Sequence, residues 1–314
     1  MLDRNRSEYF PHIFRQNIWL EARQRQPMDQ FDRGFVTRFL GDNFGNGLSS
    51  FFPLYLKPQT KPQNSLLDEP VAPAEYHPNL TQAAAEYLAH LDADAPALFH
   101  HLIAILHAPA YRTDNAGALK QDWPRIPLPA TREQLLASAE LGRQVAALLD
   151  TETPLPGVTQ GKPRPELATL ALLTVVDAAP LAPEHLKLTA GWGHAGQGGV
   201  TMPGKGKTIS RPFAATEQPA LGEETLDVYL NAGCYWKNVP RPVWELTLGG
   251  YQVLKKWLSY RELALLGRPL TPDEALEFTW MARRLAALIG LRPALDGNYR
   301  ACLEKSVRWP ISWQ

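Results

Sequence analysis

The chain has 314 residues, and its 32 Lys and Arg balance its 32 Asp and Glu, so the formal net charge is zero. With 45% hydrophobic and 20% charged residues, the composition is that of a folded protein, which excludes wholesale disorder, collagen-like structure and a coiled coil. Proline is enriched at 28 residues, about 9% against a usual level of roughly 5%, and predicts long, stiff connections between elements.

The first part of the chain carries short runs of β-forming residues. Residues 17–22 and 34–40 are predicted to be strands, and a turn cluster follows at 41–47. Residues 51–56 form a third run, and the proline inside it predicts an edge strand because proline lacks the N–H that a central strand donates. A loop rich in Pro, Gln and Lys is expected over residues 57–78.

Helical patterns follow. Thr81 is expected to cap a helix that continues to about residue 91, and residues 98–106 form a strongly apolar helix. Residues 122–129 contain three prolines and are predicted to be extended. Thr131-Arg-Glu-Gln is a capping-box pattern, which predicts a helix to about residue 149.

The second half is predicted to be β-rich and then helical. Strands are expected at residues 186–189, 225–230 and 243–248. Residues 251–261 are predicted to be helical. In the last predicted helix, residues 271–289, a threonine N-cap, a proline at N1 and a glutamate at N3 occur together.

These elements predict an α+β fold, with β-rich segments at about 15–56 and 185–250 and helical blocks at about 79–149 and 251–290. Residues 151–166 are rich in Pro, Gly and Thr and are typical of a linker. We therefore expect an N-terminal half over 1–150 and a C-terminal half over 167–314, and a single continuous domain remains the alternative.

A glycine-rich stretch at residues 191–208 invites comparison with a phosphate-binding loop. The match fails because Gly199-x4-Gly204-Lys205 is followed by glycine, where a P-loop has Ser or Thr. We expect a mobile loop here, with lysines placed to touch a phosphate backbone. The sequence also lacks a nucleophile elbow and the Asp/Asn-Pro-Pro-Tyr/Phe loop of an adenine methyltransferase, so catalysis and a bound cofactor are not expected of this chain.

Metal, disulfide and membrane sites are not expected either. Cys234 and Cys302 have no metal-type spacing, and the adjacent His100 and His101 point to different faces of a helix. No apolar stretch approaches the ~20 residues that span a bilayer, and the N-terminus lacks the pattern of a signal peptide. A cytoplasmic protein without a membrane partner is therefore predicted.

A run of aromatic and basic residues lies at about 225–268. From Lys205 to Arg261 the chain has eight Lys and Arg and five Asp and Glu, so this stretch is mildly basic. Lysine and arginine contact phosphates, while Asn and Gln can read adenine edges. The alternative is that Trp244 and Trp257 are core residues and that Lys255 and Lys256 form a solvated helix face. The candidate DNA-binding residues are Lys205, Lys207, Arg211, Asn231, Tyr235, Lys237, Asn238, Arg241, Gln252, Lys255, Lys256 and Arg261, with Arg112 and Lys120 from the first half.

Four blocks in a fixed order resemble a known family. They are Phe51-Phe-Pro-Leu-Tyr-Leu56, the stretch 98–127 with Phe-His-His-Leu-Ile-Ala-Ile-Leu and Asp-Trp-Pro-Arg-Ile-Pro, the tryptophan-rich stretch 235–244, and Leu248-Gly-Gly-Tyr-Gln-Val-Leu-Lys-Lys-Trp-Leu258. Together they are similar to the C-terminal specificity domains of single-polypeptide Type ISP and Type IIG-like restriction–modification enzymes and of related phage-defence adenine methyltransferases.

The resemblance implies a target-recognition domain that binds double-stranded DNA and directs an adenine-specific methyltransferase domain or subunit. That methyltransferase is missing from this chain, so S-adenosylmethionine would bind only to the missing domain or partner. Two rival functions stay open. One is a protein–protein assembly module of a phage-defence complex, docking through the helices at 98–106 and 272–289; the other is a free-standing enzyme, which no residue pattern supports.

Overall fold

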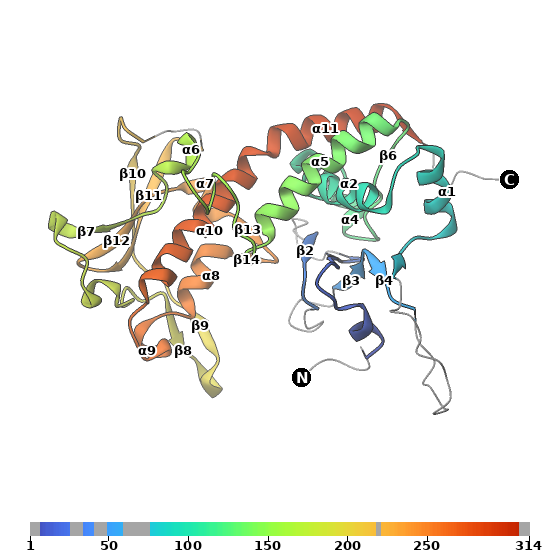
Figure 1. The fold of residues 1–314 in the computed structure, drawn as a ribbon. Helices are drawn as coiled ribbons and strands as arrows, with labels where there is room; N and C mark the ends of the chain where they lie inside the picture. The colour runs from blue at the N-terminus through green and yellow to red at the C-terminus, as the bar shows by residue number, and fades with distance from the viewer. Residues whose placement is uncertain (1–6, 26–33, 41–48, 59–75, 218–220, 308–314) are drawn as a thin grey trace, which may run out of the picture. The chain divides into compact units, whose positions relative to one another are not determined.

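The computed structural model describes residues 7–25, 34–40, 49–58, 76–217 and 221–307. The predicted turn cluster at 41–47 and most of the loop at 57–78 lie outside these residues. The chain folds as two compact units, which we treat separately: unit 1 contains residues 1–150 and 291–314, and unit 2 contains residues 151–290 (Figure 1). Both units combine helices with small antiparallel sheets, so the predicted α+β class is confirmed.

Unit 1 pairs a small sheet with a group of helices. Its strands are β1 (Trp19–Ala22), β2 (Phe35–Thr37), β3 (Ser50–Pro53), β4 (Tyr55–Leu56), β5 (His77–Pro78), β6 (Leu128–Pro129) and β15 (Ser306–Val307). Its helices are α1 (Gln82–His90), α2 (Ala95–His107), α3 (Pro109–Asp114), α4 (Ala116–Leu119), α5 (Arg132–Leu149) and α11 (Arg292–Glu304), with a 3-10 turn at Ser7–His12. The three predicted strands and the three predicted helices of this half are confirmed, and β3 lies at the edge of the sheet β2-β1-β3.

Unit 2 is built on a four-stranded antiparallel sheet in the order β10-β11-β12-β7. Its strands are β7 (Leu172–Val175), β8 (Gly193–Ala195), β9 (Thr201–Pro203), β10 (Thr208–Pro212), β11 (Glu224–Asn231), β12 (Cys234–Pro240), β13 (Thr247–Leu248) and β14 (Tyr251–Gln252). Its helices are α6 (Pro165–Ala168), α7 (Arg241–Glu245), α8 (Val253–Ser259), α9 (Leu263–Leu266) and α10 (Pro272–Gly290), with 3-10 turns at Val176–Ala178, Pro183–Leu186 and Gln197–Gly199.

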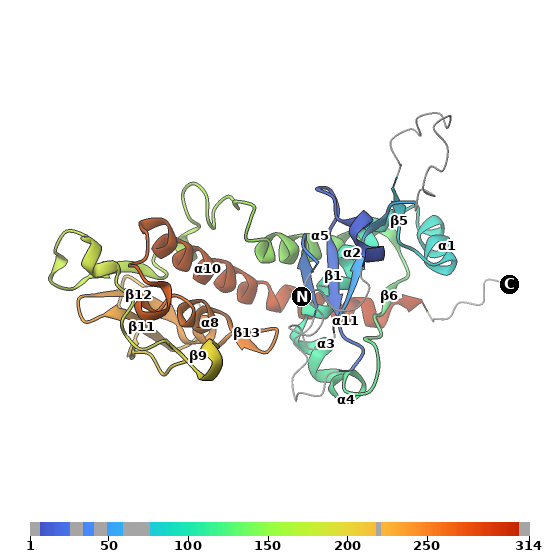
Figure 2. The same cartoon turned by 90° about the horizontal axis from the view of Figure 1, so that it is seen from below.

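One face of this sheet forms the core of unit 2 with α10 (Figure 2). The buried Trp236 stacks on Phe278 of α10 with ring centroids 4.0 Å apart, and its indole N–H donates to the carbonyl of Ala275. Trp257 of α8 packs edge-on against both rings. The capping box that starts α10 forms as predicted, because Glu274 accepts from the Thr271 N–H at 2.8 Å and donates its own N–H to the Thr271 hydroxyl.

Two predicted strands of unit 2 are wrong. Residues 186–189 leave a 3-10 turn as an irregular segment. Leu186 and Leu188 alternate inward as in a strand, but their carbonyls accept from Leu270 in a loop and from Leu263 at the start of α9. The Thr189 N–H donates to the Leu230 carbonyl of β11, and this single bond does not extend into a strand pairing. Residues 243–248 begin inside the short helix α7, where Pro242 in the first turn favours helical backbone, and only β13 at their end is extended.

The division of the chain also differs from the predicted halves. Residues 151–166 belong to unit 2, where Val158 is buried and Arg284 donates to the Thr153 carbonyl at 2.6 Å, so this segment is folded and not a free linker. Residues 291–314 return to unit 1. Helix α11 was not predicted from the sequence.

Buried polar groups hold the helices of unit 1 together. His101 Nε2 bonds to the Pro127 carbonyl, so this nitrogen carries the proton and Nδ1 accepts from the Ser138 hydroxyl at 2.7 Å. Asn298 of α11 donates to the same hydroxyl at 2.9 Å. His107 Nε2 likewise donates to the Gly34 carbonyl. Burial lowers the pKa of His101 to about 4 and that of His107 to about 3, so both rings are neutral at pH 7.

We predict that these two histidines make unit 1 acid-sensitive. Their pKa values in the folded chain lie below the ordinary value of 6.5, so as pH falls below 6.5 the unfolded chain binds protons first and the free energy of unfolding decreases. Each histidine contributes a slope of up to about 1.4 kcal/mol per pH unit. We would measure the free energy of unfolding in urea at several pH values between 7.5 and 4.5. This free energy should change less with pH in His107→Leu than in the wild type, whatever the stability of the variant at pH 7.5. The exposed His77→Gln serves as control, and an unchanged slope in the His107 variant would contradict the assignment.

The contact between α2 and α5 generates a second prediction. Gly142 of α5 lies so close to the His100 backbone that a Cβ there would overlap the His100 carbonyl oxygen. Gly142→Ala should therefore lower the free energy of unfolding by about 1–3 kcal/mol, since the two helices must separate. Gly297→Ala in α11 is the matched control, because a Cβ there meets open space and alanine favours helix by about 0.5–1 kcal/mol. Thermal melts give the melting temperature of each variant. Equal changes in melting temperature for Gly142→Ala and Gly297→Ala would refute the close contact.

Candidate nucleic-acid interface

The face of the unit 2 sheet opposite α10 carries an aromatic pair. Because side chains alternate along a strand, Leu230 and Trp236 point to the core while Tyr229 and Tyr235 lie on the other face. The two tyrosines are direct cross-strand partners, and their rings stack with centroids 5.0 Å apart and an interplanar angle of 22°. Burial raises the pKa of both phenols, so they stay neutral donors at pH 7. We call this pair the tyrosine platform.

One predicted DNA-binding lysine adjoins the platform. The Lys207 ammonium sits 4.2 Å from the centre of the Tyr229 ring, a cation–π distance. Lys205 and Lys207 are both exposed, and neither makes an ion pair with any carboxylate that the structure describes. These two ammonium groups are therefore available to a phosphate.

Arg211 and Lys237 lie on the same face within a charge network. The Arg211 guanidinium binds Glu217 at 2.7 Å and Asp227 at 2.9 Å, each through two nitrogens, and Lys237 lies 3.6 Å from Glu217. The hydrogen bonds from Arg211 hold the pKa of Glu217 below its ordinary value. Two cations and two carboxylates balance, so a phosphate would have to displace Glu217 or Asp227 to reach Arg211.

The three predicted base-reading amides are engaged with the protein's own backbone. Asn231 donates to the carbonyls of the 184–187 turn, at 2.7 Å to Lys187, and accepts from the Gly233 N–H. The buried Asn238 adopts a φ of 63° and donates to the Thr169 carbonyl. Gln252 donates to the Trp244 carbonyl at 2.6 Å. Each amide holds a turn or the end of a short helix in place.

The predicted arginines are also paired. Arg241 binds Glu224 at 2.6 Å and Glu245 at 3.3 Å. Arg261 lies over the Trp257 ring at 4.1 Å and 3.7 Å from Glu277. In unit 1, Arg112 donates to the Leu106 carbonyl at the end of α2, and Lys120 is exposed just after α4. The two units therefore divide the predicted set.

Helix α8 presents two more predicted lysines. Lys256 lies between the exposed rings of Tyr251 and Tyr260, 4.5 and 4.6 Å from their centres. Lys255 beside it is half-buried. Trp257, by contrast, is a core residue, as is Trp244, which bears out the alternative proposed for the tryptophans.

Two residues that sequence reasoning missed fix the glycine-rich stretch. The buried Glu262 accepts from the N–H groups of Gly191 and Trp192 at 3.1 and 2.8 Å. The Trp192 side chain is fully buried and donates to the Tyr229 carbonyl at 2.8 Å. Gly206 packs on the Trp192 ring so closely that no Cβ would fit. The expected mobile loop is therefore wrong for residues 191–193 and 204–206, which are hydrogen-bonded or closely packed. The repeated glycines around Trp192 were the sequence signal for this close packing.

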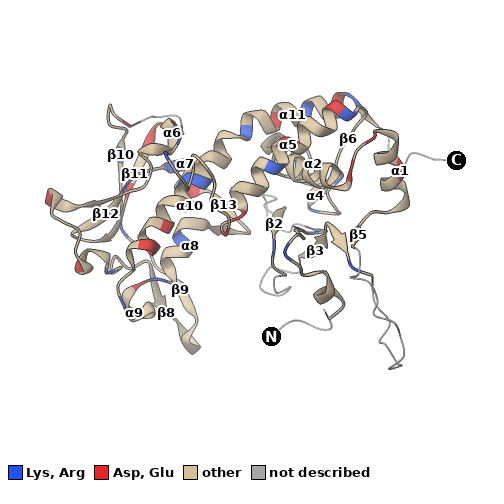
Figure 3. Cartoon of the chain, in the orientation of Figure 1, with Lys and Arg blue, Asp and Glu red and all other residues tan. Residues whose placement is uncertain are grey.

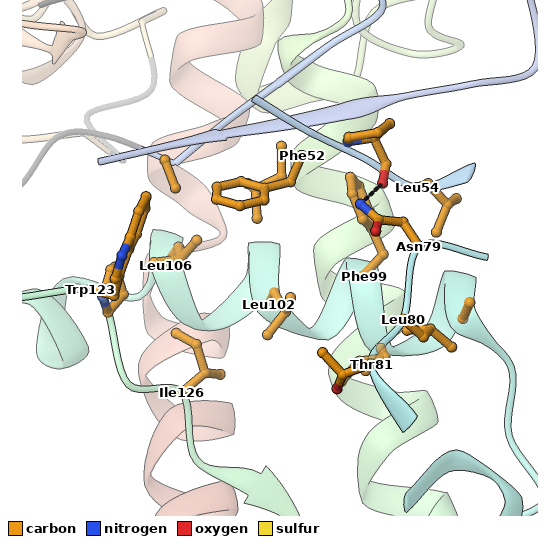
Figure 4. Close-up of a pocket in the computed structure, with 16 residues that line it drawn as sticks. Phe52, Leu54, Asn79, Leu80, Thr81, Phe99, Leu102, Leu106, Trp123 and Ile126 are labelled. Carbon is orange, nitrogen blue, oxygen red and sulfur yellow. Dashed lines mark hydrogen bonds between the residues drawn. The ribbon is translucent and has the colours of Figure 1, made fainter. Parts of the chain in front are cut away.

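Unit 1 contains an apolar pocket of about 440 Å³ between its sheet and α2 (Figure 4). Its lining includes Phe52, Leu102, Leu106, Trp123 and Ile126, with Asn79 and Thr81 as its polar members. Among the residues that the structure describes, no titratable side chain lines it, and these residues offer no general acid or base. Across the part of the chain that the structure describes, no three His, Cys, Asp or Glu residues gather as metal ligands, and no helix has the length and apolar character to cross a membrane.

Comparisons with known proteins show what this chain is similar to. A family profile described as the Type ISP C-terminal specificity domain matches residues 1–277. No curated protein matches. Among solved structures, a cryo-EM DrdV–DNA complex is similar with 20% identity and a TM-score of 0.53, over 90% of this chain and 24% of that one. The ATP-dependent Type ISP restriction–modification enzyme LlaBIII bound to DNA follows, with 13% identity and a TM-score of 0.52, over 90% of this chain and 16% of that one.

Both likenesses show a shared fold, and this chain spans less than a quarter of the length of either structure. The family profile carries more weight, because it covers both the β-rich first segment and the whole sheet of unit 2. The chain therefore belongs to the Type ISP C-terminal specificity domain family.

Proposed function

We propose that this chain recognises a DNA target sequence for an adenine-specific methyltransferase of a restriction–modification system, and that catalysis and S-adenosylmethionine binding belong to that methyltransferase. Membership of a specificity-domain family supports the recognition role. DrdV and LlaBIII were both solved on DNA, which gives the same role a structural parallel.

The observation that carries the proposal is a stretch without carboxylates beside the tyrosine platform. Residues 185–216 contain Lys187, Lys205, Lys207 and Arg211 but no Asp or Glu, although one residue in ten of the whole chain is acidic. In Figure 3 the β8–β9 hairpin inside this stretch shows no acidic segment. Arg211 is engaged by Glu217 and Asp227, so Lys205 and Lys207 are the exposed cations that this stretch offers to a polyanion. Their contacts with phosphates would release condensed counterions.

The assembly alternative loses its proposed docking surfaces. In α2, Ile103, Ala104 and Ile105 are completely buried in unit 1, where this helix packs on α5. In α10, Phe278 stacks on Trp236 and Thr279 bonds the Ala171 carbonyl within unit 2. Most apolar residues of both helices lie in the internal core, and Leu276 is the exposed large apolar side chain of α10, so neither helix offers the broad apolar face that this hypothesis required.

We predict that Lys205→Ala/Lys207→Ala weakens binding to every duplex. Each lost phosphate contact should reduce the slope of log affinity against log salt by about 1. The control Lys162→Ala/Lys305→Ala removes two exposed lysines that make no described contact with the platform tyrosines, and it should leave the slope unchanged. Fluorescence anisotropy from 50 to 300 mM salt measures both; equal slopes for the two double variants would count against the proposed surface.

For Arg211, we predict an effect on stability and not on the salt slope. Arg211→Ala leaves Glu217 and Asp227 buried without their cation, which should cost on the order of 3 kcal/mol in unfolding free energy. Arg211→Ala/Glu217→Gln/Asp227→Asn removes the repulsion between the carboxylates and should recover part of this loss. Chemical unfolding checks both variants, and a folded Arg211→Ala protein with a reduced salt slope would instead assign Arg211 to the phosphate backbone.

A further inference from the structure

The β8–β9 hairpin projects from unit 2 as a narrow two-stranded ribbon (Figure 1). Its register pairs His194 with Met202 and Ala195 with Thr201. Val200 at the tip is 62% exposed and Met202 is 46% exposed. These two large apolar side chains are therefore exposed on the ribbon and add little to the core of unit 2.

The base of the ribbon is rigid. Gly193 packs against the Ser259 carbonyl and Gly204 against the Gly191 backbone, both too closely for a Cβ. The Gly204 N–H donates to the Trp192 carbonyl at 2.6 Å, and Glu262 fixes the preceding residues. A ribbon held at its base loses little conformational entropy when its tip binds.

The exposed side chains of the ribbon match the chemistry of base edges. Gln197 and His194 are exposed, and neither side chain has a hydrogen-bond partner among the described residues. A glutamine amide can bind N6 and N7 of adenine together, while apolar groups such as Val200 and Met202 can contact a thymine methyl. The ribbon also lies within the acid-free stretch 185–216, so no carboxylate of its own opposes approach to phosphates.

We propose that the β8–β9 hairpin enters the major groove of the target duplex and reads bases through Gln197, Val200 and Met202. This inference rests on the proposed function and adds the element that supplies discrimination. A major groove about 12 Å wide admits a two-stranded ribbon. Lys205 and Lys207 follow the second strand directly, where they hold the phosphates while the tip contacts bases.

The test distinguishes recognition of bases from binding to the phosphate backbone. The whole chain is used to select bound duplexes from a random pool, and the enriched sequences are compared for wild type, Gln197→Ala and Val200→Ser/Met202→Ser. The control Leu181→Ser/Leu276→Ser removes two exposed apolar side chains elsewhere in unit 2. All substituted residues are exposed or at the tip, and melting curves establish that each variant is folded.

We expect both hairpin variants to lose about tenfold or more discrimination at one or two base positions, while affinity for random duplex and its salt slope stay within twofold. The control should keep the wild-type motif. Hairpin variants that retain full discrimination, or that lose affinity evenly for all sequences, would overturn the hairpin's reading role and leave the proposed function standing. A wild-type chain that enriches no motif would overturn the proposed function itself.

Discussion

The alternation of side chains along β11 and β12 is the constraint on which unit 2 depends. The same seven or eight residues per strand must seat α10 on one side and present a polar surface on the other. Trp236 and Leu230 satisfy the first requirement, and Tyr229 and Tyr235 satisfy the second. A slip of one residue in register would exchange the two faces, so the core and the candidate interface are specified together.

Charge in this chain is distributed by pairing and not by net excess. Arg211, Arg241 and Arg261 neutralise carboxylates and stabilise the scaffold. Lys205 and Lys207 have no such partners in the described structure and follow a ribbon without acidic residues. In unit 2, these three arginines are thus engaged by carboxylates, while the exposed ammonium groups of Lys205 and Lys207 are not. A chain with zero net charge can in this way place unbalanced positive charge locally.

Local signals in the sequence were sufficient for much of the fold. Thr81, Thr131 and Thr271 each cap the helix that the sequence predicted, because a cap depends only on residues within one turn. The strand predicted at 243–248 failed because hydrophobic alternation shows burial but not backbone conformation. At 186–189, the Thr189 N–H reaches β11, but the carbonyls of Leu186 and Leu188 accept from residues 270 and 263, outside any sheet. Helix α11 has few apolar positions and no side-chain cap, so its sequence carried a weak signal.

The candidate site was less predictable than the fold. Asn231, Asn238 and Gln252 have the right chemistry for bases, but their partners are backbone carbonyls 8 to 69 positions away that no local pattern reveals. Glu262 and Trp192 were missed for the same reason, since they meet across 70 residues. The family could be identified from the sequence because it depends on the order of four sequence blocks and not on individual side-chain contacts.

Unit 1 is formed by residues that precede unit 2 in the sequence and by residues that follow it. This arrangement determines when unit 1 can finish folding. Strand β15 pairs with β6, and Asn298 of α11 reaches Ser138 of α5, across 160 or more positions. During synthesis from the N-terminus, the whole of unit 2 must therefore emerge from the ribosome before the first 150 residues receive their last helix. Until then, the apolar surfaces of α2 and α5 that α11 covers in the folded chain remain open to water.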